Sequence, residues 1–162
     1  MRRLSVMLAV LLILVPGATG FAQITTFTAF LNIDNARPLV AAGTPASAQG
    51  MAVLVLSADR TALAYSITYT GLSGPPANAH FHRAAIGQAG GVVRTIMGGP
   101  VVPEAPAEAL PGTSGTISGV WRRTDQQPFT AELLAALLAG ELYINVHTAM
   151  NRGGETREQI MP

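Results

Sequence analysis

The sequence lacks cysteine and lysine and contains few charged residues. Without cysteine the chain can form no disulfide framework, no thiolate metal site and no cysteine nucleophile. All ten basic residues are arginine, which excludes the lysine chemistry of Schiff bases and P-loops. Charged residues make up only 12% of the 162 residues, and the formal net charge is +1. Because a phosphate backbone requires clustered cations, we expect no nucleic-acid partner.

The N-terminal residues have the pattern of a secretory signal peptide. Arg2 and Arg3 precede an apolar run over residues 4–15, and small residues at the −3 and −1 positions predict cleavage before Gln23. The run is shorter than the ~20 residues that span a membrane, although an uncleaved anchor is the alternative. We therefore predict a signal peptide over residues 1–22, a secreted or periplasmic protein, and no membrane attachment after the leader is removed.

The rest of the chain, residues 23–162, is predicted to form a single β domain. Apolar and polar residues alternate with a period of two between turn residues, which is typical of strands. One helix is expected, with Thr130 as its N-cap, a buried stripe of leucines at 133, 134, 137 and 138, and Gly140 at its end. This pattern predicts an all-β fold, either an antiparallel β-sandwich or a partly closed barrel with one short helix. The expected strands cover residues 24–31, 51–57, 62–70, 78–83, 92–97, 113–121, 141–148 and 155–160.

The three histidines of the sequence all fall in two of the predicted strands. His80 and His82 are two residues apart, so their side chains lie on the same side of a strand, roughly 6.5–7 Å apart. His147 shares the side of its strand with Tyr143 and Asn145. If the two strands are neighbours, three imidazoles could form a metal site with an open position. Imidazole suits copper and zinc, and occupancy should fall below about pH 6.5 because the rings must be neutral.

Two other interpretations of the histidines remain open. They could form a structural cluster that donates hydrogen bonds to loops, or one of them could act as a catalytic base. Three further residues are candidates for supporting the rings: Asn145, Glu155 and Arg157. Asn145 could orient an imidazole or satisfy backbone groups, and Arg157 could bind an anion or pair with a carboxylate.

Four segments of the sequence carry a recognisable pattern: N-A-H-F-H at 78–82, G-G-V-V at 90–93, A-G-E-L-Y-I-N-V-H-T at 139–148 and G-G-E-T-R-E-Q-I at 153–160. Together they resemble the CHRD domain, a family named for chordin and common in secreted bacterial proteins. The similarity covers nearly all of the chain after the leader, and the three histidine positions match. The chain departs from the usual pattern at Arg152, Thr156 and Glu158, where the family has proline, isoleucine and glycine.

The resemblance implies an immunoglobulin-like or superoxide-dismutase-like β-sandwich, but it implies little about activity. Growth-factor binding by chordin does not transfer, because the cysteine-rich modules that carry it are absent. We expect a secreted, non-catalytic protein that binds a metal ion, copper first and zinc second, through His80, His82 and His147. The alternatives are a structural or adhesive module with an unidentified protein partner, or a redox enzyme similar to superoxide dismutase. The paired-metal site of that enzyme uses more imidazoles than the three present here.

Overall fold

The computed structural model describes residues 25–108 and 110–162. This part of the chain contains eight β-strands and one α-helix. The helix α1 (Ala131–Leu138) lies between the sixth and seventh strands. The strands are β1 (Thr25–Asn32), β2 (Gln49–Leu56), β3 (Ala62–Thr70), β4 (Pro76–Arg83), β5 (Val92–Met97), β6 (Gly115–Arg122), β7 (Leu142–Thr148) and β8 (Thr156–Gln159).

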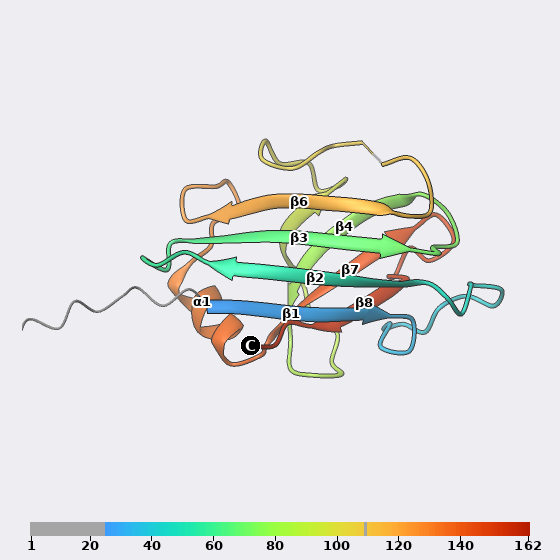
Figure 1. Ribbon diagram of the computed structural model, residues 1–162, viewed down its shortest axis with the longest axis horizontal. Helices are drawn as coiled ribbons and strands as arrows, with labels where there is room; N and C mark the ends of the chain where they lie inside the picture. Colours follow the sequence, from blue (N-terminus) through green and yellow to red (C-terminus); the bar gives the residue numbers. More distant parts are fainter. Residues whose placement is uncertain (1–24, 109) are drawn as a thin grey trace, which may run out of the picture.

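All eight strands belong to one antiparallel sheet, in the order β5-β4-β7-β8-β1-β2-β3-β6. The sheet bends back on itself, so that β1, β2, β3 and β6 form a front layer and β4 and β7 cross behind it (Figure 1). We call the strands β5, β4, β7 and β8 the back layer. The layers join where Asn32 of β1 pairs with Arg157 of β8 and Thr28 bridges Met161. The described strands β5 and β6 end the order without pairing with each other, so the barrel is only partly closed.

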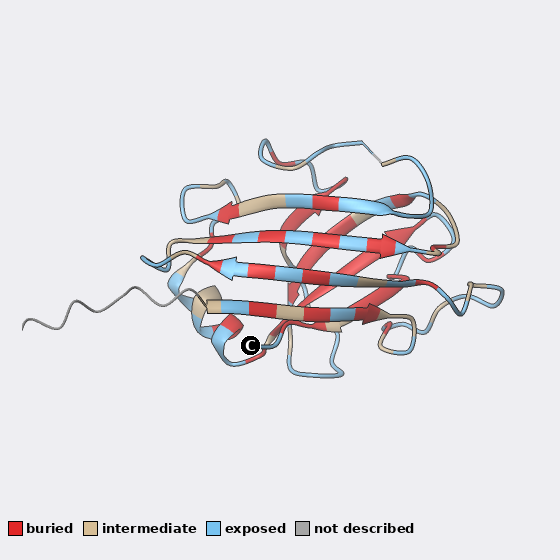
Figure 2. Ribbon diagram, in the orientation of Figure 1, coloured by how far each residue is buried: buried red, intermediate tan, exposed pale blue. Residues whose placement is uncertain are grey.

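Alternation in the sequence places one side of each front strand in the core. Figure 2 shows buried and exposed residues alternating along β1, β2 and β3. The back layer contributes Phe81, whose ring stacks on Trp121 of β6 with centroids 5.2 Å apart. The sandwich is therefore stabilised by burial of apolar side chains between the layers. In β3 the buried residues are Leu63, Tyr65, Ile67 and Tyr69.

The helix begins and ends as predicted, but fewer of its leucines are buried than the sequence pattern predicted. The Thr130 hydroxyl accepts a hydrogen bond from the backbone N–H of Leu133, and Gly140 follows the helix with φ 70°. Leu137 is fully buried, whereas Leu138 is 46% exposed. The prediction of burial is therefore wrong at Leu138, because a helix of about two turns packs only a narrow stripe against the core.

The predicted all-β fold, an antiparallel sandwich or partly closed barrel with one short helix, is confirmed. The predicted signal peptide over residues 1–22 lies outside the described residues. Among residues 25–108 and 110–162, no helix has the length and apolar character needed to cross a membrane.

Candidate metal centre

The three histidines lie together on two neighbouring strands of the back layer. β4 pairs with β7, and this register places Asn145 opposite His80. The ring centroid of His80 lies 5.6 Å from that of His82 and 5.0 Å from that of His147. The centroids of His82 and His147 are 6.2 Å apart. The condition set by the sequence, that the two histidine-bearing strands are neighbours, is met.

The histidines occupy the side of the back layer that faces away from the core, and loops cover this side. All seven residues of β7 are buried, although only Leu142, Ile144 and Val146 belong to the hydrophobic core. The three imidazoles are 6–7% exposed. We call this covered side the histidine face. The loops after β4, β5 and β7 each bring one backbone carbonyl to one of its rings.

These carbonyls determine which ring nitrogen carries the proton. His80 Nε2 lies 2.6 Å from the Gly99 carbonyl oxygen, and His82 Nδ1 lies 3.0 Å from that of Gly90. His147 Nδ1 lies 2.9 Å from the carbonyl oxygen of Arg152. A carbonyl only accepts hydrogen bonds, so in each case the ring N–H donates to it. A neutral imidazole has one N–H, and its second nitrogen therefore presents a lone pair.

The second nitrogens of His80 and His147 lie close together, and that of His82 is unpartnered. His80 Nδ1 and His147 Nε2 are 3.2 Å apart, and His82 Nε2 is buried without a hydrogen-bond partner among the described residues. One nitrogen from each ring can be chosen so that all three lie within 4.8 Å of one another. Because the protons point toward the loops, the lone pairs of His80 Nδ1 and His147 Nε2 approach each other, and the lone pair of His82 Nε2 has no hydrogen-bond partner among the described residues. Such an arrangement is suited to a cation.

Burial keeps the three rings neutral. Removal from water lowers the pKa of His80, although its hydrogen bond to Gly99 acts in the opposite direction. Burial likewise lowers the pKa of His82 and of His147 to about 4, and the neighbouring rings add to this effect. The imidazoles of His82 and His147 therefore retain their lone pairs well below the pH near 6.5 at which an exposed histidine titrates.

Tyr143 and Arg157 extend the histidine face toward β8. The Tyr143 ring stacks on His82 with centroids 4.7 Å apart and planes 6° from parallel. Its hydroxyl donates to the Gly90 carbonyl, 3.2 Å away, and accepts from the Gly90 N–H at 3.0 Å. Arg157 places its Cζ 3.8 Å from the Tyr143 ring centroid, and its Nη2 donates to the Gln88 carbonyl at 2.6 Å. Cation–π contact and a loop carbonyl thus hold this buried guanidinium.

Arg157 forms no ion pair among the described residues, so its predicted pairing with a carboxylate is not formed. Asn145 donates from Nδ2 to the Gly153 carbonyl, 3.2 Å away. Within the described part of the chain, Asn145, Glu155 and Arg157 make no hydrogen bond to an imidazole. Their contacts are with the loops and with Tyr143, so any support that they give to the rings is indirect.

Glu155 organises the turn that covers His147. Its fully buried carboxylate accepts hydrogen bonds from the Ser73 N–H at 2.6 Å, from Thr148 Oγ1 at 2.6 Å and from Asn151 Nδ2 at 2.8 Å. Burial alone would raise the pKa of Glu155, but these hydrogen bonds outweigh it and lower the pKa. The carboxylate is therefore ionised, and its oxygens accept hydrogen bonds from the turn and from Ser73.

The sequence reasoning missed the three loop carbonyls and the role of Gly90. A Cβ on Gly90 would collide with the Arg83 carbonyl oxygen, so the loop can approach β4 only with glycine at this position. The double glycine at 90–91 was a signal of a turn. A backbone carbonyl has no side-chain signature, however, and no sequence pattern could have assigned Gly99 or Arg152 to a histidine.

Comparison with known proteins identifies a family for this chain. No curated protein and no solved structure matches the chain. The sequence model of the CHRD domain matches residues 27–160, which include all three histidines and β2 to β8 in full. The chain therefore belongs to the CHRD domain family.

Proposed function

We propose that this protein binds a transition-metal ion through His80, His82 and His147, with copper preferred and zinc second. The CHRD family suggests a non-catalytic extracellular module, so the proposed activity is binding rather than turnover. The observation that carries the proposal is the 3.2 Å approach of His80 Nδ1 to His147 Nε2. Both nitrogens present lone pairs there, and a cation between them would turn a repulsive contact into an attractive one.

The spacing of these nitrogens suits a tetrahedral ion. With metal–nitrogen bonds of about 2.0–2.1 Å, two ligands of a tetrahedral site are roughly 3.3 Å apart, close to the observed 3.2 Å. In each ring the N–H of the nitrogen that does not face the proposed metal donates to a backbone carbonyl, which is a usual partner of metal-bound histidines. Because affinity for imidazole sites generally peaks at copper among the divalent ions, copper should bind more tightly than zinc.

Metal titration of the apo protein tests the proposal directly. We expect one equivalent of Cu²⁺ to bind, Zn²⁺ to bind more weakly, and neither to bind specifically after His80, His82 and His147 are all changed to alanine. Met150→Leu is the matched control, because it removes an exposed thioether close to His147 in the sequence without touching a ring. Equal and negligible uptake by the wild type and the triple variant would refute the proposal.

The low pKa values sharpen the expected pH dependence. The sequence alone predicts loss of metal below about pH 6.5. Because burial lowers the pKa of His82 and His147 to about 4, protons should compete with the metal only at more acidic pH. We therefore expect the bound metal to be retained at pH 5.5. Half-release near pH 6.5 would show that the rings are less shielded from water than the structure indicates.

The hydrogen bonds from the rings to three separate loops favour a second candidate function, in which the histidines brace the loops of a structural or interaction module. Bracing uses the N–H of each ring and metal binding uses the lone pair, so one melting experiment separates the contributions. In the presence of a chelator, bracing predicts that the triple alanine variant melts below the wild type. Metal binding predicts that added copper raises the melting temperature of the wild type alone.

We further propose that the protein is secreted or periplasmic, which the extracellular character of CHRD domains supports. The predicted leader supplies the route, with cleavage before Gln23. Mass spectrometry of the protein isolated from its producing cells tests this point. A mature chain that begins at Gln23 is expected, and a cell-associated chain that begins at Met1 would contradict the proposal.

A further inference from the structure

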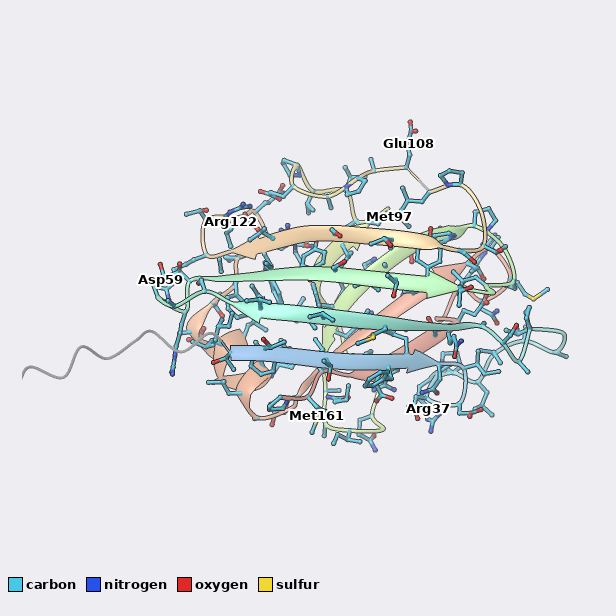
Figure 3. All side chains as sticks on the ribbon, in the orientation of Figure 1. Arg37, Asp59, Met97, Glu108, Arg122 and Met161 are labelled. Carbon is cyan, nitrogen blue, oxygen red and sulfur yellow. The ribbon has the colours of Figure 1, made fainter. Side chains whose placement is uncertain are left out.

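The outward side of the front layer, which we call the front face, is nearly free of charge. In the four strands β1, β2, β3 and β6, all of whose residues are described, Arg122 is the only charged residue, and it is the last residue of β6. Figure 3 shows Arg122 and Asp59 at one end of the layer and Arg37 beyond the opposite end of β1. The charges therefore lie at the margin and not within the face.

Apolar side chains run across this face. Phe30 of β1 is 63% exposed, and Met51, Val53 and Val55 of β2 are 37–40% exposed. Phe30 lies opposite Met51 in the β1–β2 register, so the four side chains form one continuous stripe. Threonine, serine and alanine surround the stripe on β1, β3 and β6. A continuous exposed apolar stripe of this kind is typical of an interaction surface.

We propose that the front face is a homodimer interface, on which a second copy of this chain packs face to face. A face without charge offers nothing to select a charged partner, whereas a second copy presents an equally uncharged surface and meets no repulsion. The described residues also carry eight arginines and nine acids, so two copies have almost no net charge to keep them apart.

The area of the face is sufficient for a specific contact. Four strands about 4.8 Å apart, with eight residues each at about 3.3 Å, cover roughly 500 Å². Two such faces would together bury roughly 1,000 Å², the lower limit of specific interfaces. The expected dimer is therefore reversible, and its formation should depend on protein concentration. The histidine face belongs to the back layer, so the proposed metal site lies outside the dimer interface.

Sedimentation of the full-length protein over a range of concentrations tests this inference. We expect the wild type to shift from monomer to dimer in the micromolar range. Val53→Glu and Ser66→Glu should each raise the dissociation constant about tenfold or more, because each places like charges opposite one another at the centre of the interface. Ser66 is opposite Val53 in the β2–β3 register and is already polar and exposed, so its variant does not remove an apolar contact.

Val101→Glu is the matched control, because Val101 is 69% exposed in a loop outside the front face. Its dissociation constant should equal that of the wild type, and all variants should bind metal as the wild type does. A wild type that stays monomeric at about 100 µM overturns the proposal. The occupant of the front face would then be something other than a second copy of this chain. So does a dimer that both front-face variants leave intact.

Discussion

The two outward sides of the sandwich are built from similar strands but have opposite characters. The front face is open to solvent, uncharged and apolar along one stripe. The histidine face, on the outward side of the back layer, is polar, and loops cover it so completely that every residue of β7 is buried. Both sides follow the same period-two rule, but only one of them has loops folded over it.

The difference shows what a covered polar face requires. Buried imidazoles, amides and carboxylates are tolerated only when they are hydrogen-bonded, and here the covering loops supply most of the partners. The front face needs no such partners, because water solvates its polar groups. Substitutions on the histidine face should therefore be costly, whereas single substitutions on the front face should leave the stability of the monomer almost unchanged.

Acidification should affect the histidine face most. His82 and His147 titrate near 4 when folded and near 6.5 when unfolded, so protonation favours the unfolded chain as the pH falls through this interval. The loss should approach about 3 kcal/mol of unfolding free energy per ring at pH 4 and should be absent above pH 7. Urea unfolding of the apo protein at pH 7, 6 and 5 measures it. His147→Asn should reduce the dependence of the unfolding free energy on pH. An unfolding free energy that does not vary between pH 7 and pH 5 would contradict the low pKa values of the two histidines.

Gly90→Ala should destabilise the protein by about 2–3 kcal/mol, because the new Cβ would collide with the Arg83 carbonyl and displace the carbonyl that orients His82. The adjacent Gly91→Ala is the control, since a Cβ there has no heavy atom within 4 Å. Both the melting temperature and the copper affinity should fall for Gly90→Ala, and neither should change for Gly91→Ala. Equal effects of the two substitutions would show that the close approach of this loop is unimportant.

Glu155→Gln should cost about 2 kcal/mol, because an amide N–H would then face donors that now bond to a carboxylate. The same change at Glu141 is the matched control. Glu141 forms an exposed ion pair with Arg83, at 3.2 Å, and such pairs contribute little. Chemical unfolding at pH 7 gives both values. If Glu155→Gln and Glu141→Gln are equally stable, the buried carboxylate of Glu155 contributes no more to stability than the exposed one of Glu141.

Val53→Thr should have the smallest effect, below about 0.5 kcal/mol, because the new hydroxyl on the front face is exposed to water. The identical change at Val146, a fully buried core residue of β7, should cost about 2 kcal/mol, since its hydroxyl would lack a partner. Measurements at low protein concentration keep dimerisation from contributing. A large loss at Val53 in the monomer would mean that the front face is not simply solvated.

The strands and the core could be predicted from local patterns. Residues 62–70 and 92–97 match β3 and β5 at both ends, because turn residues flank both segments, although only β3 alternates regularly between buried and exposed residues. The sequence could not predict that β4 and β7 pair, because which strands are neighbours depends on the topology of the whole sheet. The predicted metal site therefore remained conditional on that pairing. Leu138 shows the reverse case, in which a correct helical pattern could not indicate how little of the helix the core would cover.

By itself, the sequence determined that this protein is an all-β member of the CHRD family whose histidines fall in two strands, because alternation and motif spacing are local properties. Only the tertiary structure decided that those strands are neighbours and that loops bury their outward side. It also decided that the carbonyls of Gly90, Gly99 and Arg152 accept the ring N–H groups, so that the second nitrogen of each histidine keeps its lone pair. The physical reason is that burial and hydrogen-bond direction depend on segments that are far apart in the sequence, as the 67 residues between His80 and His147 show.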